Sequence, residues 1–396
     1  MFKTEDVLAM KKFVSIVVPA LNEELTIGEF IQWCQQGLGD AGVDGEIIIV
    51  DSSTDKTTQI AESMGARVIK VPQKGLGQAY IDALPYIRGE YIIMGDCDLT
   101  YDFRHIKLFI AELDRGTEFI MGTRMKGYIE KGAMPNIHRY FGTPLTTFIL
   151  NLIYGSKYSD IHCGMRAITL SALKRMNLES PEWEYASEMV LKAKKIKLRT
   201  AEIPIRFYKD RKGRVSHHKR IGWFSPWYAG WINLKVMFLY SPSFFLMGPG
   251  KISMVLGLLL FFALVKGQIL FLSIHGMLLG ITLTIMGYAA LQMGMLSEVI
   301  YDFNPEESFK YKKPFSYNKG VITGLFLTIV GLVFLINFFY TAIKSGFLLK
   351  EISRVALAGF LLIIFGFQTF TFTLVFNMVV NKNEALLRKK KDTHDV

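Results

Sequence analysis

The chain has few cysteines and lacks a leading apolar run. Among its 396 residues, Cys34, Cys97 and Cys163 lie far apart and form no CxxC pair. This pattern excludes a disulfide scaffold, argues against a structural zinc site and is typical of a reducing compartment. The first dozen residues carry five charged side chains and no apolar stretch, so we expect no cleavable signal peptide.

Apolar residues are instead concentrated in the last third of the chain. Hydrophobic residues make up 51% and mean hydropathy is +0.27, although 20% of residues are charged. Four apolar stretches, at about 244–265, 270–296, 319–342 and 353–380, approach or exceed the ~20 residues that cross a bilayer. They lack the paired acids or arginine rows of transporters and voltage sensors. We therefore expect about four membrane helices that anchor the chain, rather than buried helices of a large soluble protein.

The distribution of lysines predicts how these helices are oriented. Lys310, Lys312 and Lys313 lie in the connection between the second and third stretches, and the tail carries Lys389, Lys390 and Lys391. The other two connections are poorer in basic residues. The positive-inside rule therefore predicts a cytoplasmic N-terminal part and a cytoplasmic basic tail.

Most of the net charge of +11 comes from one segment. Residues 192–220 hold twelve lysines and arginines against Glu202 and Asp210, and Trp223, Trp227 and Trp231 follow on one face of a predicted helix. Cations beside amphipathic rings favour a bilayer with anionic headgroups. A nucleic-acid surface needs no such tryptophans, and a solvated basic face would explain only the charges. We expect no nucleic-acid partner.

The first 220 residues alternate between strand and helix patterns. Apolar strands are predicted at 13–18, 46–50, 66–70 and 91–94, with helices opening at 22–24, after Asp55 and after Gly77. Such alternation predicts an α/β fold with a mostly parallel, Rossmann-like sheet. Ligands of these sheets bind at the carboxyl ends of the strands.

Asp96-Cys97-Asp98 is the most specific signal at those ends. Two carboxylates one residue apart face the same way on an extended chain and can share a divalent cation with a diphosphate. Cys97 would point away from that cation. A plain polar turn is the alternative for this motif. Asp51 ends the second strand, where it could read a nucleoside.

The N-terminal part contains four motifs in order: Val17-Val18-Pro19-Ala20-Leu21-Asn22-Glu23-Glu24, Ile49-Val50-Asp51-Ser52-Ser53-Thr54-Asp55-Lys56-Thr57, Lys74-Gly75-Leu76-Gly77 and Asp96-Cys97-Asp98. In this order and spacing over residues 12–220, they resemble glycosyltransferase family 2, which has the GT-A fold. Four further motifs follow: Gly122-Thr123-Arg124, Asp160-Ile161-His162-Cys163-Gly164-Met165-Arg166, Tyr185-Ala186-Ser187-Glu188-Met189 and Ile203-Pro204-Ile205. They look like the polyisoprenyl-phosphate branch of that family, which contains the dolichol-phosphate mannose and glucose synthases.

The resemblance implies a role for each matching position. Asp96 and Asp98 would hold Mg²⁺ or Mn²⁺, and Arg124 and Arg139 would attract the acceptor phosphate or the leaving diphosphate. The nucleotide sugar, the lipid phosphate and their pockets would involve Pro19, Ala20, Asn22, Glu23, Asp51, Lys74, Gly75, Gly77, Arg166, Glu188, Arg211, Arg214 and Ser216.

Some of these side chains could serve the scaffold instead of a ligand. Arg124 and Arg166 could be ion-paired scaffold residues, Glu188 a helix-surface acid and Asp160 a cap. The sequence also departs from the family pattern at Ser216, which is followed by a histidine where a lysine is usual.

The resemblance implies metal-dependent, inverting transfer of one hexose from GDP-mannose or UDP-glucose to a polyprenyl or dolichyl phosphate. An anionic acceptor needs no strong general base. A glycolipid or polysaccharide acceptor is the second hypothesis, and its neutral hydroxyl would need Glu188 or Asp160 as base. A non-catalytic membrane subunit is the third.

We expect four parts along the chain. Residues 1–221 would form the GT-A domain, 222–243 an amphipathic interfacial helix, 244–380 the transmembrane domain and 381–396 a basic cytoplasmic tail. Association of several copies through the membrane helices is an open expectation.

Overall fold

The structure, a computed structural model, describes residues 12–211, 213–214, 235, 238, 241–265, 273–300, 315–346 and 353–392. The chain divides into two compact units, Met1–Tyr240 and Ser241–Val396. Most of the expected interfacial helix, with its three tryptophans, and the last residues of the expected tail lie outside the described residues. The domain boundaries inferred from the sequence therefore stay a prediction.

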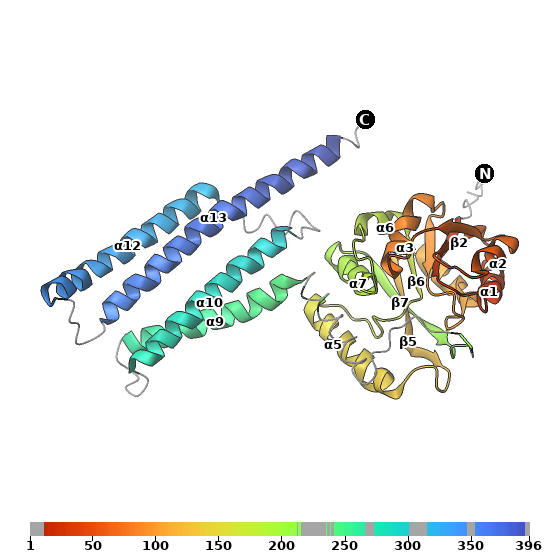
Figure 1. The fold of residues 1–396 in the computed structure, drawn as a ribbon, viewed down its shortest axis with the longest axis horizontal. Coiled ribbons are helices and arrows are strands. Elements are labelled where there is room, and N and C mark those ends of the chain that lie inside the picture. The colour runs from red at the N-terminus through yellow and green to blue at the C-terminus, as the bar shows by residue number, and fades with distance from the viewer. Residues whose placement is uncertain are drawn as a thin grey trace, which may run out of the picture. The chain divides into compact units, whose positions relative to one another are not determined.

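A seven-stranded sheet forms the centre of the first unit (Figure 1). The strand order is β3-β2-β1-β4-β6-β5-β7, and only β6 runs antiparallel to its neighbours. The predicted mostly parallel sheet is thus confirmed. The strands are β1 (Val14–Ala20), β2 (Gly45–Asp51), β3 (Arg67–Lys70), β4 (Tyr91–Met94), β5 (Phe119–Ile129), β6 (Arg166–Thr169) and β7 (Thr200–Phe207).

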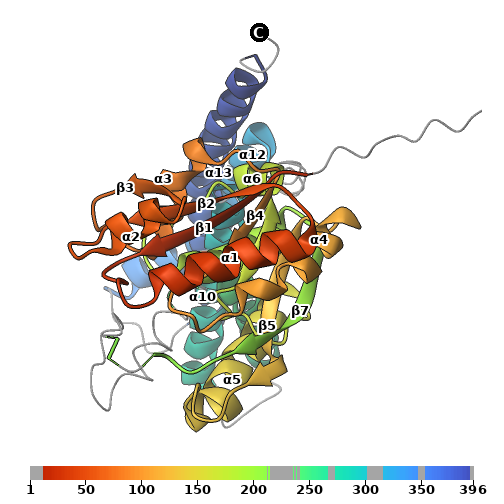
Figure 2. The same ribbon diagram turned by 90° about the vertical axis from the view of Figure 1, so that its right-hand side faces the viewer.

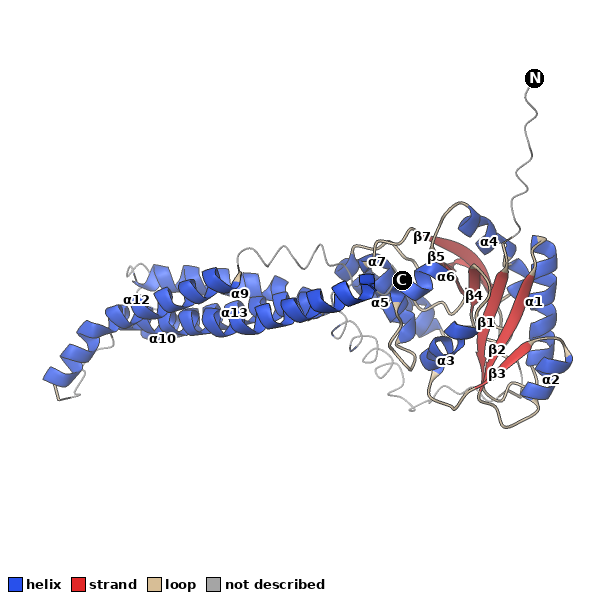
Figure 3. Ribbon diagram, turned by 90° about the horizontal axis from the view of Figure 1, so that it is seen from above, coloured by secondary structure: helices blue, strands red, loops and turns tan. Residues whose placement is uncertain are grey.

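Helices cover both faces of this sheet (Figure 3). The central strands β1 and β4 are buried on both sides, which is why they read as continuous apolar runs. Helices α1, α2 and α4 lie on one face, and α3, α6 and α7 lie on the other (Figures 2 and 3). Their bounds are α1 (Ile27–Ala41), α2 (Thr57–Ser63), α3 (Leu76–Ala83), α4 (Lys107–Asp114), α5 (Thr143–Tyr154), α6 (Leu170–Met176) and α7 (Tyr185–Lys195).

The first helix begins later than the sequence suggests. The sequence predicts a start at residues 22–24, but α1 starts at Ile27. Asn22 has a left-handed backbone with φ of 53°, and its side-chain oxygen accepts a hydrogen bond from Thr54 N at 2.9 Å. Asparagine tolerates this conformation better than most residues. The polar residues after β1 therefore bind the loop after β2 instead of forming a helical turn.

The register of the sheet brings distant motifs to one edge. Ala20 pairs with Asp51 at the carboxyl ends of β1 and β2. Met94, at the end of β4, pairs with Arg166, at the start of the antiparallel β6. The loops that follow β1, β2 and β4 and the loop that precedes β6 consequently meet at this edge.

The described residues of the second unit form four long apolar helices, as the sequence predicts. They are α9 (Pro242–Val265), α10 (Ser273–Ile300), α12 (Tyr317–Lys344) and α13 (Arg354–Asp392), and each is long and apolar enough to span a membrane. Pro249, a residue that often ends a helix, lies inside α9.

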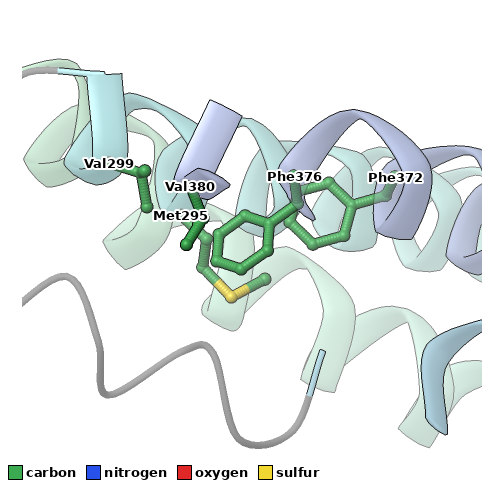
Figure 4. Packing of buried hydrophobic residues seen from close by; sticks show 5 residues of the cluster. All are labelled: Met295, Val299, Phe372, Phe376 and Val380. Carbon is green, nitrogen blue, oxygen red and sulfur yellow. The ribbon is translucent and has the colours of Figure 1, made fainter. Parts of the chain in front are cut away.

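These helices pack as two close pairs, α9 with α10 and α12 with α13. A Cβ at Gly287 of α10 would lie 2.4 Å from the backbone nitrogen of Met254 on α9, so only glycine allows this approach. The third contact joins α10 to α13 through the cluster drawn in Figure 4. It consists of Met295, Val299, Phe372, Phe376 and Val380.

Candidate active site

Asp51, which is expected to read a nucleoside, lies at the carboxyl end of β2. Its side chain is fully buried and accepts hydrogen bonds from Ser53 N at 2.8 Å and from Thr58 Oγ1, with Lys70 Nζ at 2.9 Å. Burial by itself raises the pKa of Asp51, but these hydrogen bonds outweigh it and the pKa is lowered. The carboxylate is therefore charged and held in a fixed orientation.

The loop after β1 forms the adjoining wall. Asn22 N donates to Ser53 Oγ at 2.7 Å, and Glu23 N donates to Thr57 Oγ1 at 2.8 Å. Beside them the thiol of Cys97, which is buried, donates to Pro19 O at 3.3 Å. The expected pocket residues of β1 and β2 are thus brought together, and Cys97 faces the protein interior.

Asp96 and Asp98 follow β4 at the same edge. Asp98 Oδ1 accepts hydrogen bonds from Thr100 N at 3.0 Å and from Thr100 Oγ1 at 2.6 Å, and Oδ2 takes part in neither of them. Burial and, next, the charge of Asp98 raise the pKa of Asp96 to about 7, and burial raises that of Asp98. A cation bound beside the two acids would stabilise their charged forms.

The donor set suits a divalent ion of the kind expected. Within the described part of the chain, no three His, Cys, Asp or Glu side chains are grouped closely enough to hold a metal alone. Mg²⁺ commonly takes one or two carboxylates and completes its shell with water and substrate phosphates. Gly164 leaves room for this arrangement, since a Cβ there would lie 2.8 Å from Asp96 Oδ2.

Arg214 lies beside these acids. Its Nε donates to Glu23 Oε2 at 2.6 Å and its Nη2 pairs with Glu23 Oε1, while its Nη1 lies 3.6 Å from Asp98 Oδ2 and 3.2 Å from Asp210. Although burial opposes it, the hydrogen bond to Glu23 raises the pKa of Arg214. The guanidinium therefore partly neutralises the acidic edge.

Arg211 lies apart from this group. It donates to Glu29 Oε2 at 2.5 Å and to Leu25 O at 3.2 Å, so it is attached to the start of α1. Ser216, the third residue expected in this segment, lies outside the described residues.

The expected diphosphate loop precedes α3. Lys74 is exposed, and Gly75 has φ of 116°, a conformation that favours glycine. A Cβ at Gly75 would lie 2.4 Å from Pro181 O, and one at Gly77 would lie 2.1 Å from Ser180 O. These glycines therefore permit close packing against the loop before α7, a requirement that the sequence does not reveal.

Arg124 forms a buried, two-pronged ion pair with Asp160. Its Nε lies 2.7 Å from Asp160 Oδ2, its Nη2 lies 2.8 Å from Oδ1, and only 8% of the residue is exposed. Burial alone would raise the pKa of Asp160, but Arg124 lowers it. This geometry is that of an ion-paired scaffold residue, the alternative role considered for Arg124. Asp160, considered as a possible helix cap, is the partner in this ion pair.

Arg166 and Glu188 are both fully buried. The Arg166 guanidinium donates to three backbone carbonyls, those of Cys163 at 3.0 Å, Ala186 at 2.7 Å and Ile161 at 3.2 Å. Glu188 is not the helix-surface acid that the sequence allowed. Both side chains are enclosed by the protein, as the side chain of Asp51 is.

Among the described residues, Arg139 differs from Arg124, Arg211 and Arg214 because it pairs with no carboxylate. It lies in the short π-helix η3 (His138–Gly142) with its guanidinium 5.4 Å from the ring of Tyr140. Helix α5 follows directly and extends to one margin of the unit (Figures 1 and 2).

The η3–α5 segment carries a large exposed apolar face. Its buried side contains Thr143, Thr147 and Leu150. In the sequence, the apolar residues of this segment are three or four positions apart. This spacing normally predicts a helical face that is buried. The exposed residues are Ile137, Tyr140, Phe141, Leu145, Phe148 and Leu152, and 42–71% of each remains exposed.

Two family models match the chain. One, described as glycosyl transferase family 2, matches residues 15–176, and the other, described as the family 2 C-terminal transmembrane region, matches residues 303–380. The low-salt glycan biosynthesis hexosyltransferase of Haloferax volcanii is 32% identical over 90% of this chain and 86% of its own. A dolichyl-phosphate hexose transferase of the same organism is 30% identical over 51% of this chain and 85% of its own.

A solved structure is also similar to part of the chain. Glucosyl-3-phosphoglycerate synthase from Mycobacterium tuberculosis, in complex with Mn²⁺, UDP and glucosyl-3-phosphoglycerate, shares 23% identity. The match covers 57% of this chain and 77% of that chain, with a TM-score of 0.41.

Proposed function

The chain belongs to glycosyltransferase family 2 and is a membrane glycosyltransferase, and on that premise we propose that it transfers one hexose from a nucleotide diphosphate sugar to a polyprenyl phosphate. GDP-mannose and UDP-glucose are the proposed donors. The dolichyl-phosphate hexose transferase to which the chain is similar has this class of acceptor in its name.

The burial and ion pairing of the two candidate bases is the observation that supports a phosphate acceptor. A neutral hydroxyl would need Asp160 or Glu188 to remove its proton. Both are fully buried, Asp160 is bound to Arg124, and Glu188 lies 2.5 Å from Lys192 Nζ. A base must reach the proton that it removes. This supports an acceptor that is already an anion at neutral pH, such as a lipid phosphate, over the glycolipid and polysaccharide alternatives.

The residues of this chain would then act by positioning and by charge. Pro19, Ala20, Asn22 and Asp51 would enclose the nucleoside, and Lys74 would approach the diphosphate from the loop before α3. Mg²⁺ or Mn²⁺ between Asp96 and Asp98 would neutralise charge on the leaving diphosphate.

Cations of the chain would complete the arrangement. Arg214, with Arg211 and Ser216 of the same segment, would close over the donor or the lipid phosphate. Arg139 would align the attacking phosphate oxygen, and Arg124 would support this side of the site through Asp160. We propose inversion at the anomeric carbon as the outcome of such a direct displacement.

The apolar face of η3–α5 supports a lipid surface as the partner. An exposed apolar patch of this size commonly marks a protein or membrane contact, and this chain is an integral membrane protein. Contact with the bilayer would place Arg139 at the level of the lipid phosphates. We also propose that the catalytic unit and the tail are cytoplasmic, as the lysine distribution suggests.

A donor panel tests the reaction directly. Protein in detergent is mixed with Mg²⁺ or Mn²⁺, a polyprenyl phosphate and labelled UDP- or GDP-sugars. We expect label in an organic-soluble product that releases its sugar in mild acid. Label in a different lipid would instead support the glycolipid hypothesis, and nucleotide binding without any transfer would contradict the proposed reaction.

Replacing Phe141 and Phe148 by glutamine tests the membrane-facing helix. Each side chain is more than 60% exposed, so we expect little change in thermal stability. Each ring inserted into lipid contributes about 1–2 kcal/mol, so the KM for polyprenyl phosphate in anionic liposomes should rise about tenfold or more. The KM for the nucleotide sugar should stay within about twofold.

Leu108→Gln on α4 is the matched control for this experiment. Leu108 is 53% exposed but belongs to another helix, so its replacement should leave both KM values unchanged. An equal rise of the acceptor KM in the control, or no rise in the Phe141 and Phe148 variant, would count against bilayer contact through η3–α5.

A further inference from the structure

The loop over residues 177–182, between α6 and α7, packs onto the start of α3. Pro181 O accepts a hydrogen bond from Gln78 N at 2.8 Å. Pro181 O and Ser180 O also face the positions where Gly75 and Gly77 lack a Cβ. The conformation of the candidate diphosphate loop therefore depends on the location of residues 180 and 181.

A buried ion pair on α7 determines where this loop lies. Both oxygens of Glu188 accept backbone hydrogen bonds, Oε1 from Glu179 N and Oε2 from Ser180 N, each at 2.9 Å. Lys192, one turn later on α7, has its Nζ 2.5 Å from Glu188 Oε1 and donates to Asn177 O at 2.6 Å. Both side chains are fully buried. One ion pair thus binds both the beginning and the middle of the loop.

The same helix is linked to the acidic edge of the sheet. The ring of Tyr185 on α7 lies 5.0 Å from that of Tyr80 on α3, and Tyr80 OH donates to Gly95 O at 3.0 Å. Gly95 directly precedes Asp96. Helix α3 is therefore held at its first turn by the loop and at its second turn by contacts with α7 and with the residue before Asp96.

We propose that Glu188 and Lys192 are positioning residues for the donor diphosphate. Through residues 177–182 they fix Lys74, Gly75 and the first turn of α3 relative to Asp96, without touching the ligand themselves. The inference rests on the proposed function, since it concerns the pocket for the nucleotide sugar. Breaking a buried pair leaves an uncompensated charge, so the loop should rearrange when one partner is changed.

Glu188→Gln is the first test. The amide keeps the shape of the side chain but replaces one acceptor oxygen by a donor, so it cannot accept from both loop N–H groups. We expect UDP or GDP with Mg²⁺, measured by calorimetry on the full protein in detergent, to bind about tenfold more weakly. The KM for the nucleotide sugar should rise equally, with kcat and the KM for polyprenyl phosphate within twofold.

The double variant Glu188→Gln/Lys192→Met removes both charges and guards against misfolding, because neutral replacement of a buried pair is often tolerated. It should also lose nucleotide affinity, since the loop has still lost its carboxylate.

Glu46→Gln is the control. Glu46 accepts from Ser15 Oγ, Arg67 Nη1 and Arg88 N at the amino end of β2, away from the pocket, so its loss should leave nucleotide affinity unchanged.

Wild-type nucleotide affinity in Glu188→Gln and in the double variant, with or without a lower melting temperature, would overturn the inference. A failure of the proposed function would give a different combination of binding and transfer results. A wild-type protein that binds neither UDP nor GDP would contradict the nucleotide-sugar reaction and this inference with it. Nucleotide binding that weakens as expected, in a protein that transfers no sugar to polyprenyl phosphate, would support the inference and contradict only the acceptor.

Discussion

Asp98→Asn is expected to reduce sugar transfer by about a hundredfold or more while the protein stays folded. The amide oxygen can keep the hydrogen bonds from Thr100 N and Thr100 Oγ1, so the turn after β4 should survive. The negative charge of Oδ2, which faces Arg214 at 3.6 Å, is lost. Electrostatic groups at the leaving group typically contribute two to three orders of magnitude in rate.

Initial rates with a polyprenyl phosphate acceptor, together with a thermal melt, measure this effect. Asp210→Asn is the matched control, because Asp210 contacts the same arginine at 3.2 Å but lies on the exposed segment after β7. It should stay within about threefold of wild type. An Asp98→Asn enzyme with more than a tenth of wild-type activity would contradict the role proposed for this carboxylate.

The sequence was sufficient to predict that the candidate site residues meet at one edge of the sheet. Apolar strands followed by polar turns place Asp51 and Asp96 at carboxyl ends, and parallel pairing brings those ends together. The strand pattern is local, and the burial of β1 and β4 leaves little freedom in register. The fold class and the meeting of the candidate residues at one edge therefore follow from local signals.

The state of each arginine could not be predicted in the same way. The four arginines of the site region look alike in the sequence, but a partner can lie far along the chain, as Glu23 does, 191 positions from Arg214. Their surroundings differ: Arg124 is paired with one acid, Arg166 is surrounded by carbonyls, Arg214 contacts three acids, and Arg139 contacts an aromatic ring. Tertiary contacts, rather than local pattern, separate the cations with a structural role from those that a phosphate can approach.

Burial on two further helices could not be predicted from the sequence for a related reason. Glu188 and Lys192 have the i, i+4 spacing of an exposed helical ion pair, but both are buried because the loop over 177–182 covers them. The apolar residues of α5 have the spacing of a core-facing helix, but they are exposed. Periodicity identifies a face of a helix and does not reveal what covers it.

Breaking the Arg124–Asp160 pair is expected to cause the largest loss of stability. Asp160→Asn leaves the guanidinium of Arg124 buried without its charged partner, and such changes typically cost about 3–5 kcal/mol. The effect should extend beyond the pair. Asp160 Oδ1 also accepts from His162 N at 3.3 Å, and His162 Nε2 lies 2.8 Å from Thr146 Oγ1 on α5. Activity should therefore fall together with the melting temperature.

Two further variants separate a structural role from a catalytic one. Arg124→Met combined with Asp160→Leu removes both charges and should recover much of the stability that the single change loses. Lys126 is on the same strand as Arg124 and forms a partly exposed pair with Glu202 of β7, so Lys126→Met should cost less than about 1 kcal/mol. If the double variant recovers its melting temperature and also regains transfer activity, Arg124 acts by supporting α5 and the residues before β6. If stability returns while activity stays at least about a hundredfold down, Arg124 contacts the reacting phosphates directly, and the supporting role proposed here is wrong.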